Sequence, residues 1–82
     1  MASESAGPGA ALPPKTRELT ALGCALALRQ EDRIEHCVTD CLRTGAMPEE
    51  IMEVLRLATV MAECPGDRYR AIVQEAIAAF GR

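Results

Sequence analysis

Two segments of this chain, residues 19–28 and 51–62, are apolar on almost every face of a helix. Only a few small or polar residues interrupt them: Thr20, Gly23, Glu53, Arg56 and Thr59. A helix with a single packing partner needs one apolar stripe, so helices that are apolar all round are buried on more than one side. A chain of 82 residues has room for only one small core. We therefore expect one or both of these helices to pack against other copies of the chain.

The types of apolar residue predict an all-α fold. Apolar residues make up 49% of the chain, yet it has no Trp, one Phe and one Tyr. Ala, Leu, Ile, Val, Met and Cys supply the rest, a composition that favours helices over strands. We expect a small bundle of about four helices over residues 13–82.

Start and stop signals place the first two helices. Pro13 and Pro14 open the first, which we expect over residues 13–30, because proline is tolerated where the backbone donor has no helical partner. The second is predicted over residues 31–44, with acidic residues at its start and Gly45 as a left-handed stop. Its apolar stripe consists of Ile34, Cys37, Val38, Cys41 and Leu42.

The third and fourth helices are separated by the segment Cys64-Pro65-Gly66. Pro48 and the two acids after it begin the third helix. Met47, just before Pro48, offers no capping hydroxyl or carboxylate, at a cost of about 1 kcal/mol. Asp67 is expected to cap the fourth helix, which ends at Gly81. The stripe of this last helix consists of Tyr69, Ile72, Val73, Ala76, Ile77 and Phe80.

Residues 1–12 are small, polar and rich in Gly and Pro, so we expect a disordered tail without the features of a signal peptide. The longest nearly apolar run, residues 19–28, is half the length that a membrane span requires.

Basic residues are scattered and the net charge is −3, which disfavours nucleic acid as a partner. A cytoplasmic protein follows, in which four cysteines are expected to be free thiols, catalytic groups or ligands.

Two motifs and their spacing resemble the carboxymuconolactone decarboxylase family, including its alkylhydroperoxidase D-like branch. The motifs are Lys15-Thr16-Arg17-Glu18-Leu19 and Leu42-Arg43-Thr44-Gly45-Ala46-Met47-Pro48-Glu49-Glu50-Ile51. The resemblance implies an alkylhydroperoxidase D-like helical bundle that assembles as a homo-trimer or hexamer. It also implies either thiol-dependent hydroperoxide reduction or decarboxylation of a lactone, so that the substrate is a small peroxide or carboxylate. No cofactor is expected.

The redox branch of that family combines a glutamate, a C-x-x-C pair and a histidine in one relay. Counted along this chain, these positions fall on Glu18, Gln30, Arg33 and Cys37, so only the glutamate is retained. The resemblance therefore implies a proton-relay role for Glu18, while the usual dithiol and imidazole are replaced.

Cys37 is the candidate nucleophile. Arg33 lies one turn before it, and a guanidinium near the start of a helix favours a thiolate. Attack on a peroxide would give a sulfenic acid, resolved by Cys24, Cys64 or a thiol of another subunit. The alternative is that Cys37 and Cys41 are small hydrophobic residues of the stripe. Their i, i+4 spacing of about 5 to 6 Å is too long for a relaxed disulfide, and we expect none between them.

Glu18 also has two interpretations. If the second helix folds back on the first, Glu18 could form an ion pair with Arg33 at the position of the family's relay. Alternatively it is an acid that merely suits the first turns of a helix. His36 is interpreted as a surface residue flanked by Asp32 and Asp40. The cysteines lack the usual pairing of a zinc site, and no metal is expected.

The sequence thus predicts a thiol peroxidase-like oxidoreductase with Cys37, Glu18 and Arg33 as catalytic residues. Two alternatives stay open. One is a non-catalytic oligomeric scaffold or binding protein on the same fold. The other is a divergent lactone decarboxylase with a carboxylate pocket lined by Arg33 or another arginine. Three methionines, Met47, Met52 and Met61, either line a pocket or fill the core.

Overall fold

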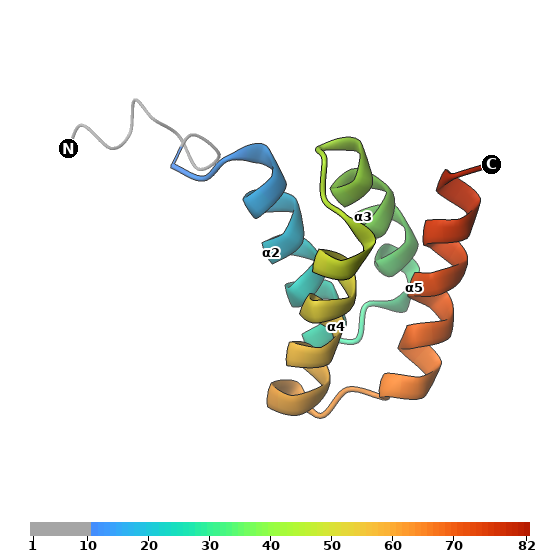
Figure 1. Cartoon of the computed structure of the whole chain (residues 1–82). Coiled ribbons are helices and arrows are strands. Elements are labelled where there is room, and N and C mark those ends of the chain that lie inside the picture. The colour runs from blue at the N-terminus through green and yellow to red at the C-terminus, as the bar shows by residue number, and fades with distance from the viewer. Residues whose placement is uncertain (1–10) are drawn as a thin grey trace.

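The computed structural model describes residues 11–82, which fold into four helices and no strands (Figure 1). The helices are α2 (Pro14–Ala27), α3 (Glu31–Arg43), α4 (Pro48–Ala62) and α5 (Gly66–Phe80). This confirms the predicted all-α bundle. Most of the predicted tail, residues 1–10, lies outside the described residues. None of the helices within residues 11–82 has the length and hydropathy that crossing a bilayer requires.

Successive helices run in opposite directions, and α3 and α4 lie between α2 and α5 (Figure 1). Helix α2 packs on α3 and α4, and α5 packs on the same two helices from the other side. The core is therefore shared by all four helices. Its largest fully buried side chains are Leu22, Leu26, Ile34, Val38, Cys41, Ile51, Tyr69 and Val73.

Helix α2 ends at Ala27, three residues earlier than expected. The chain turns there because Arg29 adopts a left-handed conformation with φ +56°. The amide of Gln30 donates to the carbonyl of Ala25, and the amide of Arg29 donates to that of Leu26. This is a Schellman turn, which glycine usually makes, so the sequence carried no stop signal at this position.

Helix α3 ends with the same pair of hydrogen bonds, from Ala46 to Cys41 and from Gly45 to Leu42. Gly45 has φ +98°, which confirms the predicted left-handed stop. Helix α3 ends within one residue of its predicted boundary.

The starts of α4 and α5 differ from the prediction in detail. At Met47 the side chain forms no capping hydrogen bond, but the carboxylate of Glu50 accepts the Met47 amide at 2.8 Å, which offsets part of the expected cost. Asp67 does not cap α5, because the helix begins one residue before it, at Gly66. Asp67 instead lies in the first turn, where a carboxylate suits the helix dipole.

Within α5, Tyr69, Val73 and Ala76 are buried, as the predicted stripe requires. Phe80 at its end is 45% exposed, contrary to its predicted place in the stripe. Phe80 is the last residue of α5, one turn beyond Ala76, the last buried residue of the helix.

Candidate functional site

The predicted catalytic residues lie along the contact between α2 and α3. Glu18 is in the second turn of α2, while Arg33 and Cys37 are in the first half of α3. Glu18 and Cys37 are half-buried, whereas Arg33 is exposed. The charge of Glu18 raises the pKa of both Cys37 and Cys41, which shows that the fold brings this carboxylate close to the two thiols.

Glu18 and Arg33 do not form an ion pair in the structure, which was one of the two interpretations of Glu18. Glu18 accepts from Nε of its neighbour Arg17 at 3.3 Å. The reason is the direction of the two helices, because an antiparallel hairpin places the start of α3 beside the end of α2. Glu18, near the start of α2, therefore meets the later residues Cys37 and Cys41.

The surroundings of Cys37 raise the pKa of its thiol. Burial is the largest cause, followed by the carboxylates of Asp40 and Glu18. Arg33 lowers the pKa of Cys37, as predicted, but its effect is outweighed. The pKa of Cys37 is therefore shifted in the direction that disfavours a thiolate in the single chain, because burial and two negative charges oppose one exposed guanidinium.

Cys41 is fully buried, and burial together with the neighbouring Cys37 and Glu18 raises its pKa to about 12. A thiol with such a pKa stays protonated at neutral pH and packs as a small hydrophobic residue. The packing interpretation thus describes Cys41, while Cys37 remains partly accessible.

All four cysteines, Cys24, Cys37, Cys41 and Cys64, are free thiols in the structure. Cys24 is exposed on α2, and its charge contributes to the raised pKa of Cys37. Cys64 is buried between α4 and α5, with its Sγ 3.7 Å from the hydroxyl of Thr59. Of the predicted resolving thiols of the same chain, only Cys24 is both accessible and near Cys37.

His36 is exposed and its Nε2 lies 3.3 Å from a carboxylate oxygen of Asp40, as expected for a surface histidine. Asp40 also pairs with Arg43 at 3.5 Å. No group of three or more His, Cys, Asp or Glu side chains within residues 11–82 is arranged to hold a metal ion.

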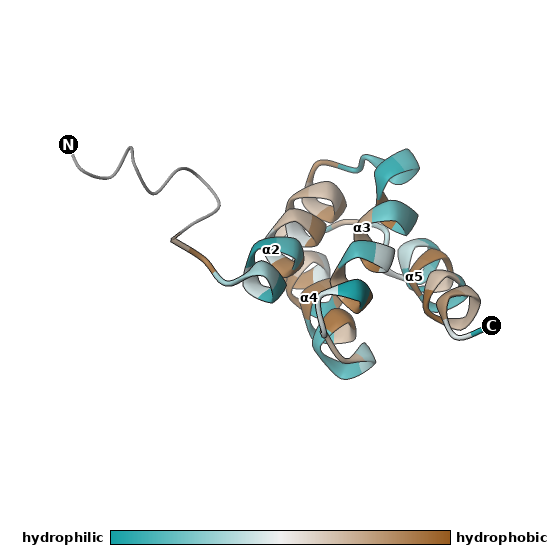
Figure 2. Cartoon of the chain, turned by 90° about the horizontal axis from the view of Figure 1, so that it is seen from above, coloured by the Kyte–Doolittle hydropathy of each residue, from teal (hydrophilic) through white to brown (hydrophobic). Residues whose placement is uncertain are grey.

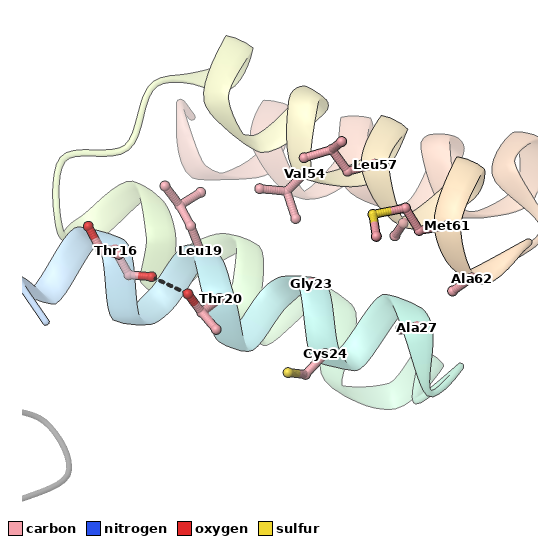
Figure 3. A pocket seen from close by; sticks show the side chains of 11 residues that line it. Thr16, Leu19, Thr20, Gly23, Cys24, Ala27, Val54, Leu57, Met61 and Ala62 are labelled. Atoms are coloured by element: carbon pink, nitrogen blue, oxygen red, sulfur yellow. Dashed lines mark hydrogen bonds between the residues drawn. The ribbon is translucent and has the colours of Figure 1, made fainter.

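An apolar groove of about 680 Å³ lies between α2 and α4, and the sequence did not predict it as a site. The side chains of Val54, Leu57 and Met61 extend from α4 beside Gly23 and Ala27 of α2 (Figure 3). Cys24 lies at the edge of this groove, and Arg33 does not line it. The signals in the sequence were the excess of apolar residues in these two helices and Met61, which was expected either to line a pocket or to fill the core. We call this site the α2/α4 groove; its eleven lining residues are Thr16, Leu19, Thr20, Gly23, Cys24, Ala27, Val54, Leu57, Ala58, Met61 and Ala62.

The three methionines differ in their surroundings. Met61 lines the α2/α4 groove, Met52 lines a recess between α4 and α5, and Met47 is exposed before α4. Cys64, beside the Pro65-Gly66 break, is buried in the core and lines neither of these two sites.

The helical bundle and its retained motifs define the class of protein. The profile of the carboxymuconolactone decarboxylase family matches residues 2–78, and the chain belongs to this family. Comparison with curated proteins and with solved structures gave no significant match.

Proposed function

We propose that this protein is a cysteine-dependent oxidoreductase that reduces hydroperoxides, with Cys37 as its nucleophile. The proposal depends on one observation. Across the α2/α3 contact, the carboxylate of Glu18 is near enough to the half-buried thiol of Cys37 for its charge to raise the pKa of that thiol. Glu18 is the retained acid of the family's relay, and Cys37 occupies the position of its histidine. The relay's carboxylate and a thiol are thus close together, although the usual dithiol is replaced.

The chemistry requires a hydroperoxide and an external dithiol. Glu18 accepts the proton of Cys37, and the thiolate attacks the outer peroxide oxygen. The O–O bond breaks, an alcohol leaves after protonation, and Cys37 becomes a sulfenic acid. The thiol of Cys24 then attacks this sulfur and releases water, forming a disulfide that a dithiol of the reducing cytoplasm returns to two thiols. Arg33 stabilises the negative charge at Cys37 during the attack.

The pH dependence of the reaction follows from the raised pKa of Cys37. Because the thiol is the resting form at neutral pH, the thiolate population and the rate of attack rise as pH rises toward that pKa. This profile differs from that of enzymes whose nucleophilic cysteine has a lowered pKa.

Glu18→Gln provides the decisive test, because its two effects have opposite signs. Loss of the negative charge lowers the pKa of Cys37 and speeds its alkylation by iodoacetamide, while loss of the proton acceptor slows turnover of a hydroperoxide with dithiothreitol. Cys37→Ser should abolish turnover, whereas Cys41→Ser should leave it within about twofold because Cys41 stays protonated. Turnover that is unchanged in Cys37→Ser would refute the proposal.

A second candidate is the non-catalytic oligomeric scaffold or binding protein. The raised pKa of both Cys37 and Cys41 and the α2/α4 groove favour it, since neither feature needs catalysis. It predicts an assembled protein whose cysteines alkylate slowly at neutral pH and which does not turn over hydroperoxides at any pH.

Both candidates include self-association, as a homo-trimer or hexamer. Several large apolar side chains are exposed on the single chain, notably Leu28, Leu57, Val60 and Met61. Exposed apolar surface that exceeds what single-chain proteins usually carry marks interaction sites. Light scattering after gel filtration would test self-association by measuring the mass of the protein in solution. A monomer of 8.8 kDa at all concentrations would contradict it.

A further inference from the structure

His36 is the neighbour of the proposed nucleophile and takes no part in the reaction described above. It is the one histidine of the chain, and its side chain is 77% exposed on α3. Histidine is the side chain that ordinarily changes its charge near neutral pH. A positive charge that appears here as pH falls can act on the thiol of Cys37 if a fixed group connects the two side chains.

Asp40 provides this connection. Its carboxylate is held at both oxygens, with Oδ2 3.3 Å from Nε2 of His36 and Oδ1 3.5 Å from Nη1 of Arg43. Successive residues of an α-helix are about 100° apart around its axis. Asp40 is therefore about 40° from His36 and about 60° from Cys37, one turn further along α3. Around the helix axis, the carboxylate lies between the imidazole and the thiol.

The charge of Asp40 reaches the thiol of Cys37. After burial, it is the largest cause of the raised pKa of Cys37. The other groups that act on this thiol are Glu18, Arg33 and Cys24. Among these groups, all in the described part of the chain, Asp40 is the one whose carboxylate pairs with the imidazole. A proton on His36 therefore offsets a negative charge that disfavours the thiolate.

The imidazole is the group of its own surroundings that changes its charge near neutral pH. The recess around it is lined by residues of α3 alone, namely Asp32, Glu35, His36, Thr39 and Arg43. Hydrophilic residues of this kind give parts of α3 the teal colour seen in Figure 2. Carboxylates and guanidinium groups keep their charges between about pH 6 and pH 8. A change in the field around Asp40 over this range thus comes from His36.

We infer that His36 is a positioning residue of the proposed thiol reaction: its protonated imidazole pairs with Asp40, offsets the charge of that carboxylate and thereby favours the thiolate of Cys37. When His36 is neutral, Arg43 alone offsets Asp40. The inference rests on the proposed role of Cys37 as nucleophile and adds a group that responds to pH. As pH falls through the titration of His36, the thiolate population of Cys37 decreases less steeply than that of an isolated thiol.

The pH profile of Cys37 alkylation tests this inference without any turnover. N-ethylmaleimide reacts with the thiolate, and mass spectrometry follows Cys37 in the full chain. For an isolated thiol well below its pKa, the logarithm of the rate rises by about one per pH unit. At about pH 5.5 the wild type should react about threefold faster than a line of this slope drawn from about pH 8. His36→Asn, which takes up no proton, should follow the line.

Two further variants show whether the effect passes through Asp40. In an Asp40→Asn background, His36→Asn should leave the pH profile unchanged, because the carboxylate that connects the two side chains is gone. Glu35→Gln is the matched control. Glu35 is the exposed residue next to His36 and lies on the side of α3 away from Cys37, so this variant should keep the wild-type profile. Equal helix content by circular dichroism would show that each variant folds.

The outcomes separate this inference from the proposed function. A wild-type slope of one throughout, equal to that of His36→Asn, would overturn the inference. An effect of His36→Asn that is equally large with and without Asp40 would also overturn it, because the imidazole would then act on the thiol directly. Hydroperoxide turnover is measured separately. If the wild type has none while the alkylation profiles have the expected shapes, the proposed function fails and the coupling of His36 to Cys37 stands.

Discussion

Arg29 is bonded to the backbone of Glu63: its guanidinium donates to the carbonyl oxygen of Glu63 at 3.0 Å and to that of Ala62 at 3.3 Å. Both Arg29 and Glu63 have left-handed backbones, with φ +56° and +53°, and both follow the end of a helix. Arg29 therefore ties the α2–α3 turn to the end of α4 and provides hydrogen-bond donors there for carbonyls that the helix leaves without partners. Because α2 and α4 form the groove, this contact also fixes one end of it.

Arg29→Ala should lower the free energy of unfolding by about 1 kcal/mol, because it removes these hydrogen bonds and keeps the unfavourable backbone conformation. Arg29→Gly should be less destabilised than Arg29→Ala, by about 1 kcal/mol, since glycine adopts a positive φ without steric cost. Urea titration would measure both. Arg70→Ala, at an exposed arginine of α5, is the control and should change stability by less than about 0.5 kcal/mol. The reverse order of the alanine and glycine variants would contradict this account.

Glu50 should make stability depend on pH in the acid range. Its pKa is lowered by a hydrogen bond from the Met47 amide, and by Lys15, whose Nζ lies 3.0 Å from its carboxylate. A lowered pKa in the folded state stabilises the protein above the unfolded-state pKa, and this stabilisation is lost as pH falls through the folded-state value. The stability difference between wild type and Glu50→Gln, measured by urea titration, should therefore be largest near pH 7 and shrink toward pH 3. A difference that is independent of pH would contradict the prediction.

Gly66 begins α5 directly against Thr59 of α4. A Cβ atom at position 66 would lie 3.1 Å from the Cγ2 and 3.2 Å from the Oγ1 of Thr59. The rotamer of Thr59 is held by a hydrogen bond from its hydroxyl to the carbonyl of Leu55 at 2.9 Å, so the side chain cannot easily move away. Gly66→Ala should therefore be more favourable by about 1 kcal/mol in a Thr59→Ala background than in the wild type. A double-mutant cycle measures this coupling, and a value near zero would show that the contact relaxes without cost.

The reactivity of Cys37 should respond to single charges around it. Asp40→Asn should lower the pKa of Cys37, because the Asp40 carboxylate raises it, and Arg33→Ala should raise this pKa further. At a fixed pH near 8, alkylation of Cys37 is thus expected to be faster in Asp40→Asn and slower in Arg33→Ala than in the wild type. Mass spectrometry of iodoacetamide-treated protein resolves each cysteine. Exposed Cys24 provides the internal control for general thiol reactivity. Changes of equal size at Cys24 and Cys37 would contradict a local effect.

Local sequence signals determined the helices. Pro48 with the acids that follow it set the start of α4, and Gly45 set the end of α3, because these residues act on the backbone within one turn. The apolar stripe of α3 likewise identified Ile34, Val38 and Cys41 as buried. The two family motifs were enough to identify the family of the chain. Arg29 was missed because an arginine in a left-handed turn has no local signature.

Only the tertiary structure decided which side chains meet. The antiparallel packing of α2 and α3 brings Glu18 to Cys37 and separates it from Arg33, a choice that depends on helix direction and not on any local pattern. The upward shift in the pKa of Cys37 required the sum of burial and of charges from two helices. The groove beside Met61 is lined by residues of both α2 and α4, which are far apart in the sequence. Secondary structure depends on neighbours in the chain, whereas the electrostatics and shape of a site depend on residues that folding brings together from distant positions.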